Sequence, residues 1–352
     1  MRASDAANRN KIIITFTFIG ILNATLGLVQ KFYPNDLFLQ LFTNRVEGLN
    51  GNPNFFGTFL VLQSGISIVA ATTAKSRNLR LFFTALTTLF FILAIFSHTE
   101  SSWVGIFSIY LVLFVIFLIQ LIKKKSTAGS FMLRLVIVAS LSLISFIVIN
   151  ISENWVYLGS IGITIGEIKQ VAEEGGVIEH MGSNRGLIWK TVVGMLPDYW
   201  LTGCGVDALG EAMGLLDPST INMPGGVSPR VMDKAHNEVL HIAITQGIPA
   251  AITYLVWLGL VIKNGIQRVK ESKLFSRDPD AEADPNAWVW LALLMAVVGY
   301  FIQSNFNISV VTVAPYFWTF AGLLCPYPWD EKSLVKRDLG NSFKLVRKTK
   351  DK

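Results

Sequence analysis

Long apolar runs recur along the whole sequence, and they restrict the chain to folds that sit in a lipid bilayer. Eight of these runs come near the ~20 residues that a helix needs to cross a membrane. Charged residues make up only 15% of the chain, too little to cover the surface of a soluble protein of this size. We therefore expect an all-α integral membrane protein with about eight transmembrane helices, in the runs 12–29, 55–73, 81–97, 103–122, 132–150, 237–262, 287–304 and 308–325.

Basic residues are distributed unevenly between the two sides of such a fold. If the N-terminus is cytoplasmic, 23 of the 30 Lys and Arg residues lie on the cytoplasmic side and seven lie outside. This is the bias of the positive-inside rule. It predicts a multi-pass protein of the cytoplasmic (inner) membrane with both termini in the cytoplasm. The net charge of +6 then indicates contact with anionic membrane lipid and not with nucleic acid.

The lengths of the connections divide the chain into four parts. Residues 1–150 hold the first five transmembrane helices with an outer loop at 30–54, and residues 151–235 form one long extracytoplasmic loop. Residues 236–325 hold helices six to eight, and 326–352 form a basic cytoplasmic tail. Loops this long in a compact chain are usually functional.

The long outer loop is itself expected to contain helices. Residues 160–176 could form a short helix that ends at glycines. Ser183 or Asn184 can cap a second helix that ends at Pro197, with residues 187, 188, 192, 195 and 196 at helical spacing. A tight turn is expected at 203–207. For residues 211–230, both disorder and a flap over a site are open.

A histidine, His236, stands immediately before the apolar run 237–262. Titratable groups are rare in membrane spans, so one at the water boundary suggests a function. At a helix N-terminus the dipole lowers the pKa of His236 and favours the neutral imidazole that a general base needs. The alternative is an interfacial histidine that anchors a helix end. Asn237, its neighbour, belongs to the same candidate site.

Two arginines and several amides are expected on the same outer side. Arg45 lies in a Gly- and Asn-rich loop whose backbone N–H groups can approach a ligand, and Arg185 lies in the first turn of its helix. Guanidinium groups grip phosphate with two parallel hydrogen bonds. The alternative is that Arg45 and Arg185 pair with Glu47 or Glu179, or reach the lipid head groups. Gln303, Asn305 and Asn307 are either substrate contacts or helix caps.

The predicted spans carry no Asp, Glu, Lys or Arg in their interiors, which argues against an ion-coupled transporter. His236 and His241 are five residues apart, which is not a spacing that shares a helix face. This spacing argues against a metal-binding histidine pair. We expect neither a metal nor a cofactor. Two arginines and a histidine on one side fit a different chemistry, in which the arginines hold a lipid-linked pyrophosphate and the histidine takes a proton from an attacking hydroxyl.

Several motifs occur in an order that resembles the O-antigen ligase and O-antigen polymerase superfamily. The resemblance covers nearly the whole chain, and the ordered set is more specific than any single motif. The motifs are RVEG and NPN at 45–48 and 52–54, TESSW at 99–103, SNRGLIW at 183–189 with GCG at 203–205, HNEVL at 236–240 with GIP at 247–249, and FIQSNFN at 301–307.

The resemblance implies a glycosyltransferase of the C type that needs no metal. Such an enzyme moves a glycan from undecaprenyl pyrophosphate to an acceptor hydroxyl at the outer face of the cytoplasmic membrane, with inversion at the anomeric carbon. The acceptor is a lipid or a protein for a ligase and a growing glycan for a polymerase. Carried over by position, Arg45 and Arg185 bind the donor pyrophosphate, and His236 activates the acceptor. Asn237, Gln303 and Asn305 complete the expected substrate contacts.

Two departures from the family pattern stand out. Members usually have ten or more spans, whereas this sequence predicts eight, so the expected missing part is N-terminal. Glu100 stands where many relatives carry Arg, which removes one positive contact. Two other readings stay open, namely a small-anion (bicarbonate-type) transporter and a non-catalytic member of a polysaccharide assembly complex.

Overall fold

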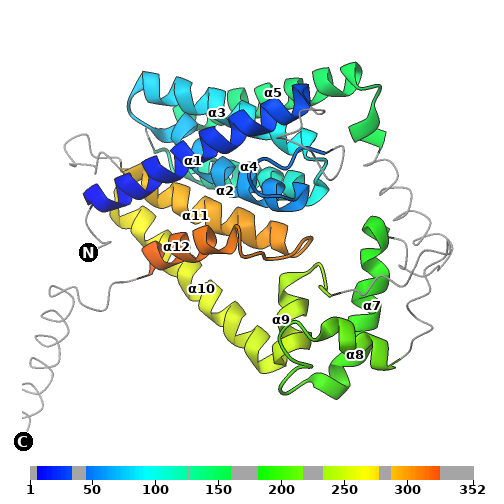
Figure 1. The fold of residues 1–352 in the computed structure, drawn as a ribbon. Coiled ribbons are helices and arrows are strands. Elements are labelled where there is room, and N and C mark those ends of the chain that lie inside the picture. Colours follow the sequence, from blue (N-terminus) through cyan, green and yellow to red (C-terminus); the bar gives the residue numbers. More distant parts are fainter. Residues whose placement is uncertain are drawn as a thin grey trace, which may run out of the picture.

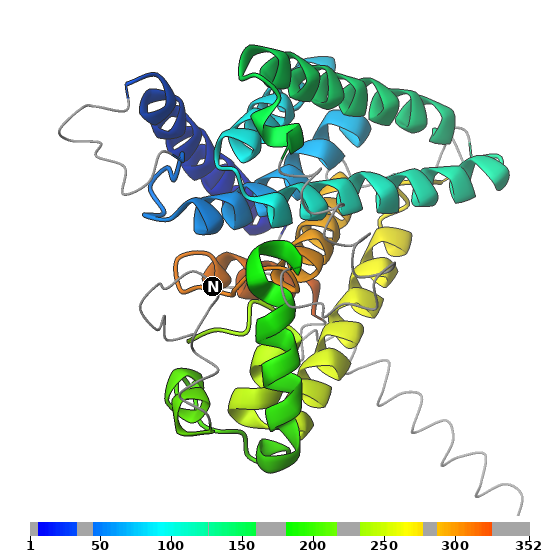
Figure 2. The ribbon, with the colours of Figure 1, turned by 90° about the vertical axis from the view of Figure 1, so that its right-hand side faces the viewer.

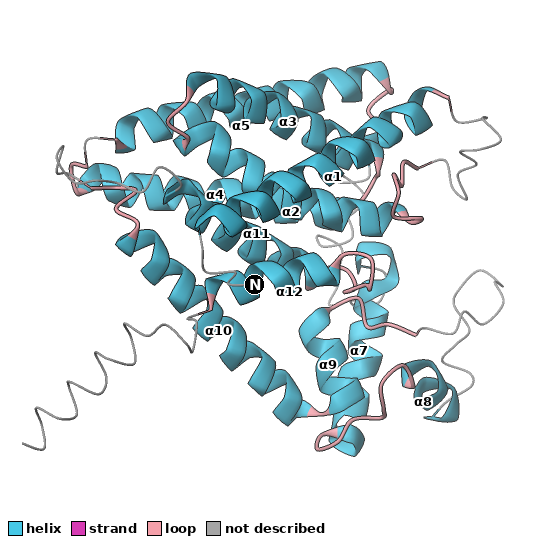
Figure 3. Ribbon diagram, turned by 60° about the vertical axis from the view of Figure 1, so that its left-hand side comes forward, coloured by secondary structure: helices cyan, strands magenta, loops and turns pink. Residues whose placement is uncertain are grey.

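The computed structural model describes residues 6–33, 45–125, 127–159, 181–216, 233–276 and 287–325, and all regular structure in these ranges is helical (Figure 3). The membrane-embedded fold predicted from the apolar runs is confirmed. Within the described ranges, seven helices are long and apolar enough to cross a membrane. The helices are α1 (Ala6–Phe32), α2 (Pro53–Thr73), α3 (Arg77–Phe96), α4 (Glu100–Ile122), α5 (Ala128–Ser152), α7 (Met181–Tyr199), α8 (Leu209–Leu216), α9 (Glu238–Gln246), α10 (Ile248–Glu271), α11 (Ala287–Ser304) and α12 (Ala314–Leu324).

Successive long helices alternate in direction, so the bundle has two distinct ends (Figure 1). At one end lie the turns 45–52, 97–99 and 305–313 together with α7, α8 and α9; we call this the loop end. At the other lie the start of α1, the turns 74–76 and 123–125, and the C-terminal end of α10; we call this the basic end. The candidate site residues Arg45, Arg185 and His236 all belong to the loop end.

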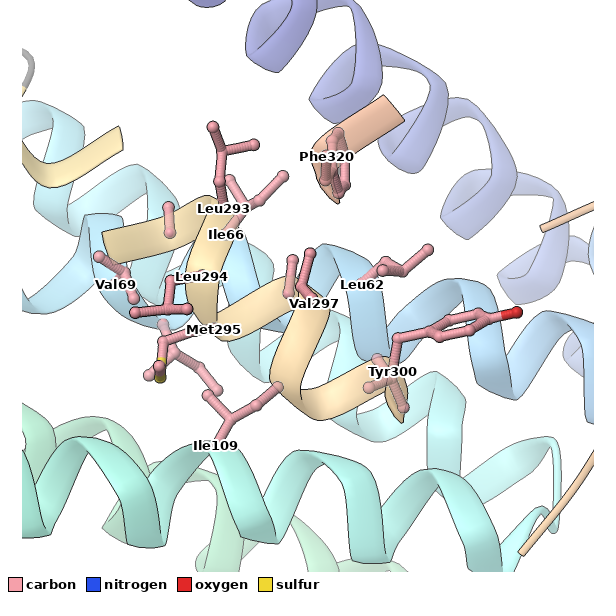
Figure 4. Close-up of a cluster of buried hydrophobic side chains, with 14 of the residues drawn as sticks. Leu62, Ile66, Val69, Ile109, Leu293, Leu294, Met295, Val297, Tyr300 and Phe320 are labelled. Atoms are coloured by element: carbon pink, nitrogen blue, oxygen red, sulfur yellow. The ribbon is translucent and has the colours of Figure 1, made fainter. Parts of the chain in front are cut away.

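Helices α2 and α11 form the centre of the bundle. Nearly every side chain of α2 is buried, and α11 packs directly along it (Figure 4). Small residues permit this approach, as is common between membrane helices. A Cβ added to Gly65 would lie 2.5 Å from the Cα of Ala296. At the loop end, the rings of Tyr300 and Phe317 stack with centroids 4.4 Å apart and join α12 to this centre.

The outer helices expose the apolar surface that a bilayer requires. Phe107 of α4, Leu143 of α5 and Val256 of α10 are 67%, 58% and 58% exposed. In water such contiguous apolar surface would be unfavourable. Against lipid tails it costs little, and the polar backbone groups are satisfied inside the helices.

Two of the predicted spans differ from the structure. The run 237–262 is divided at Gly247 (φ +95°) into the short helix α9 and the spanning helix α10. Its continuous hydropathy conceals this break. The run 308–325 yields α12, which has only 11 residues, so it is too short to cross a bilayer.

Helices α7, α8 and α9 share a second, smaller hydrophobic core beside the bundle (Figure 2). Ile188, Val192 and Met195 of α7 are buried in it, as their spacing predicted. Pro197, however, lies inside α7, which ends at Tyr199. Of the stretch 211–230, expected to be disordered or a flap, residues 211–216 are instead helical as part of α8. The predictions for residues 160–176 and 217–230 fall outside the described residues.

The expected turn at 203–207 is present and is hydrogen-bonded to the end of α9. The backbone N–H groups of Cys204 and Gly205 donate to the carbonyls of Ile244 and Thr245 at 2.8 and 3.0 Å. Gly203 has φ +71°, and a Cβ there would lie 2.2 Å from the backbone of Thr245. Glycine at this position therefore allows α9 to dock against the chain that follows α7.

Candidate active site

Arg45 is fixed by hydrogen bonds to neutral acceptors on two elements. Its Nε donates to the carbonyl of Ser97 at 2.8 Å. Its Nη2 lies within hydrogen-bond distance of the carbonyl of His98 (2.8 Å), Oδ1 of Asn54 (3.1 Å) and Oγ1 of Thr99 (3.1 Å). The guanidinium thus joins the start of α2 to the turn between α3 and α4. Nη1 takes no part in these bonds and is the nitrogen best able to meet a ligand.

The loop around Arg45 does not offer free backbone amides in the way that its glycines suggested. The N–H groups of Glu47 and Gly48 donate to Oε1 of Gln30 at 3.2 and 2.8 Å. The N–H of Leu49 donates to Oδ1 of Asn23 at 2.7 Å. Side chains of α1 therefore use these three donors. The loop serves to hold Arg45 in place, and the expectation that its amides cradle a ligand is wrong for these three.

Arg185 is largely removed from solvent, yet it lacks a fixed partner among the described residues. It is the fifth residue of α7, one turn further along than the first-turn position expected. Burial lowers its pKa, and the nearby carboxylate of Glu100 raises it. No hydrogen bond or ion pair to its guanidinium is found within the described ranges. A buried, charged guanidinium of this kind is a favourable place for an anion.

The two arginines interact electrostatically. Burial lowers the pKa of Arg45, Glu100 raises it and the charge of Arg185 lowers it again. Glu100, the first residue of α4, therefore acts on both arginines. One carboxylate faces two guanidinium groups, which leaves a net positive charge. Such an excess attracts an anionic ligand to this part of the loop end.

His236 is tied to the helix that carries Arg185. Trp189 lies four residues after Arg185, so the two side chains share a face of α7. The indole Nε1 of Trp189 donates to the carbonyl of Ala235 at 2.9 Å. Ala235 immediately precedes His236, which therefore lies beside Arg185. Figure 2 shows α7 standing next to α9, whose start follows His236.

The surroundings of His236 favour the neutral imidazole. Burial lowers its pKa, the charge of Arg185 lowers it further, and Asp233 raises it. Its backbone has φ +50°, an uncommon conformation for a residue with a side chain. Nδ1 is buried and has no hydrogen-bond partner among the described residues. Strain and an unpaired polar atom are typical of functional positions.

Asn237 acts as the N-cap of α9. Its Oδ1 accepts a hydrogen bond from the backbone N–H of Leu240 at 3.0 Å. The side-chain oxygen therefore stabilises the helix start. It also fixes the backbone at the point where the preceding residue, His236, leads into the helix start.

Gln303 and Asn305, both expected as substrate contacts, have different environments. Gln303 is fully buried, and its Nε2 donates to Thr58 Oγ1 at 2.9 Å and to Ser101 Oγ at 3.2 Å. Asn305, which directly follows α11, donates to the carbonyl of Phe301 in that helix at 2.6 Å. Gln303 thus links α11 to α2 and α4, whereas the Asn305 amide nitrogen caps α11, as the alternative interpretation proposed.

Asn307 connects this buried network to Arg45. Its Nδ2 donates to the carbonyl of Asn54 at 3.3 Å and to Thr58 Oγ1 at 3.4 Å. Asn54 also accepts from Arg45. Asn307 and Gln303 therefore stabilise the start of α2, to which Arg45 is hydrogen-bonded.

A comparison with protein-family models identifies the part of the chain that holds most of these groups. A family described as O-antigen ligase matches residues 83–255. This match supports assigning the chain to the O-antigen ligase/polymerase superfamily. No curated protein matches the sequence. The O-antigen ligase match runs from α3 into α10 and includes Arg185 and His236, whereas Arg45, Gln303 and Asn305 lie outside it.

The O-antigen ligase region also contains two residues that sequence reasoning missed as site components. One is Trp189, described above. The other is Glu238, whose carboxylate takes hydrogen bonds from the backbone and side chain of Ser309. Burial raises the pKa of Glu238 to about 7, and those bonds lower it in part. Ser309 Oγ lies 2.8 Å from Tyr300 Oη, so the start of α9 is fastened to the segment between α11 and α12.

In the sequence, both residues are typical of a different role. Glu238 looks like an ordinary first-turn acid of a helix. Trp189 looks like an apolar residue of α7. Their roles depend on partners 71 and 46 residues away in the sequence, and such separations carry no local pattern.

Proposed function

We propose that this membrane protein is a glycosyltransferase that moves a glycan from undecaprenyl pyrophosphate to an acceptor hydroxyl at the outer face of the cytoplasmic membrane. The match to the O-antigen ligase family supports the ligase-like or polymerase-like class. The observation that carries the proposal is the hydrogen bond from Trp189 to the Ala235 carbonyl. This bond brings His236, a histidine of lowered pKa, beside Arg185 and its partner arginine, Arg45. The uneven distribution of basic residues supports assigning the loop end to the outer side.

The arginines take unequal parts in holding the donor. Arg185 is the main ligand of the pyrophosphate, because its guanidinium is not committed to described neighbours. Arg45 is committed through Nε and Nη2, so it contributes its charge and Nη1. Both charges neutralise the pyrophosphate as it leaves, and we propose that no metal ion or other cofactor is required for this.

His236 is the general base. The acceptor hydroxyl oxygen attacks the anomeric carbon from the face opposite the pyrophosphate, while His236 removes the hydroxyl proton. The new carbon–oxygen bond forms as the bond to the pyrophosphate oxygen breaks. The configuration at the anomeric carbon is inverted, and the electron pair leaves on the lipid-linked pyrophosphate. A lowered pKa keeps His236 ready to accept the proton near neutral pH.

The test is complementation of a strain that lacks the gene. His236→Ala should fail to restore attachment or growth of surface glycan, with protein abundance equal to that of the wild type. His241→Ala is the matched control, because His241 is also a histidine of lowered pKa but has no role in the proposed reaction. Full surface glycan in the His236→Ala strain would disprove the general-base role.

The size of the glycans in the deletion strain separates the two acceptor classes. Long lipid-linked chains that remain unattached indicate a ligase, which transfers to a lipid or protein. Short chains that are still attached indicate a polymerase, whose acceptor is a growing glycan. Normal glycans in the deletion strain would oppose both.

A further inference from the structure

A groove opens at the basic end of the bundle, far from the candidate active site, between α4, α10 and α11. It has a volume of about 690 Å³. Its walls are apolar and come from all three helices, with Val112 and Ile116 on α4, Ile262 and Ile266 on α10, and Leu294 and Met295 on α11. These helices belong to the membrane-crossing set, so the groove faces lipid chains.

Four lysines line the groove where it reaches the end of the bundle. Lys123 and Lys125 follow the last turn of α4, and Lys270 and Lys273 lie at and just after the end of α10. Among the described residues, the groove lining contains no carboxylate. The nearest acid in sequence, Glu271, is exposed and accepts a hydrogen bond from Gln267 at 2.8 Å. Within the part of the chain that the structure describes, no lining carboxylate neutralises the positive charge at the mouth.

The position of the lysines is set by packing. Phe275, in the segment that follows α10, packs against Phe117 of α4 and Phe131 of α5 with ring centroids 6.1 and 5.9 Å away. This contact folds the chain after α10 back over the groove and fixes Lys273 at its rim. The four lysines thus line an apolar slot where the membrane-crossing helices α4 and α10 end.

We propose that this groove is a binding site for an anionic phospholipid. An acyl chain lies along the apolar walls, and the phosphate and its negatively charged headgroup meet Lys123, Lys125, Lys270 and Lys273. Basic pockets between membrane helices bind anionic headgroups in this way, because each lysine near the membrane surface adds to the attraction. A zwitterionic lipid fills the same slot without using the four charges. The site is independent of the proposed transferase reaction.

A second groove offers an internal comparison. It lies between α1 and α3 at the same end, has a volume of about 550 Å³ and is also mainly apolar. Lys75 is the one charged residue among the described residues that line it. The two grooves therefore differ in charge far more than in size. We expect lipid in both and a preference for anionic lipid only in the groove with four lysines.

The test measures lipid binding to the purified full-length chain. The protein is titrated in detergent with dioleoylphosphatidylglycerol or dioleoylphosphatidylcholine, and bound lipid is counted by native mass spectrometry. We expect the wild type to favour the anionic lipid by about tenfold or more. The variant K123Q/K125Q/K270Q/K273Q should bind both lipids equally. The control K11Q/K75Q/R77Q/K263Q removes the same charge outside this groove and should keep the preference.

The results that overturn the proposal are distinct. Equal loss of preference in both quadruple variants would show that the net charge attracts the lipid and that there is no site. The absence of a preference in the wild type would also refute it. Glycerol 3-phosphate is a further probe, because it carries the anion without the chains. If it displaces the lipid at similar concentration, the groove binds a soluble anion and the lipid assignment is wrong.

Discussion

Mutation of Arg45 should mainly lower stability and mutation of Arg185 should mainly lower activity, although both arginines bind the donor in our account. Arg45→Ala removes the donor of two backbone carbonyls, those of Ser97 and His98. The Thr99 hydroxyl can still reach the Ser97 carbonyl at 3.2 Å, but the His98 carbonyl has no second donor among the described hydrogen bonds. An unpaired buried acceptor costs ~1–3 kcal/mol. We therefore expect a loss of about 1–3 kcal/mol of unfolding free energy.

Arg185→Ala breaks no hydrogen bond to a described residue and removes a charge that is poorly hydrated. We expect its unfolding free energy to stay within about 1 kcal/mol of the wild type. Its transfer activity should nevertheless fall by about 10²-fold or more, because the pyrophosphate loses a charge-assisted contact.

The two effects are separable by measurement on the same purified preparations. Thermal melting in detergent reports stability, and glycan transfer at a temperature well below the melting point reports activity. Arg45→Ala should melt several degrees lower, whereas Arg185→Ala should melt as the wild type does. An Arg185→Ala protein that melts lower than Arg45→Ala would refute our division of roles between the two arginines.

Three further predictions follow from the loop end. Transfer activity should fall on the acid side with a midpoint below pH 6.5, because the pKa of His236 is lowered and the base works only when neutral. A midpoint above pH 6.5 in a pH–rate profile would contradict this. Trp189→Phe should cost about 1 kcal/mol of stability but reduce kcat by about tenfold at unchanged KM, since the donor to the Ala235 carbonyl is lost. Gly203→Ala should destabilise the α7–α9 unit by about 3 kcal/mol or more. Gly194→Ala, whose added Cβ meets open space, should instead stabilise α7 by about 0.5–1 kcal/mol. Hydrogen exchange of the α9 amides distinguishes these two variants.

The membrane architecture could be predicted from the sequence because it depends on one-dimensional properties. A span needs a sufficient length of apolar residues, and seven of the eight predicted runs correspond to helices that meet this requirement. The division at Gly247 was missed because hydropathy does not change across it. Gly followed by Pro249 is the combination that ends one helix and starts another, and that local chemistry was the better guide.

The candidate site could be predicted only as a set of residue types. Arg45, Arg185 and His236 were recognisable as charged or titratable groups at a membrane boundary. What fixes them was not recognisable, because Arg45 rests on carbonyls 52 and 53 residues later in the chain. The same long range separates Trp189 from Ala235. The glycines around Arg45 suggested ligand contacts, but side chains of α1 already occupy the amides of residues 47–49.

Glycan transfer by the purified protein tests the central claim most directly. The protein is reconstituted in liposomes with a synthetic undecaprenyl-pyrophosphate glycan and a candidate acceptor, in buffer containing EDTA, and the product is separated by size. Our account predicts transfer by the wild type and by His241→Ala, and loss of at least about 10³-fold with His236→Ala. Equal transfer by the wild type and His236→Ala would contradict the account.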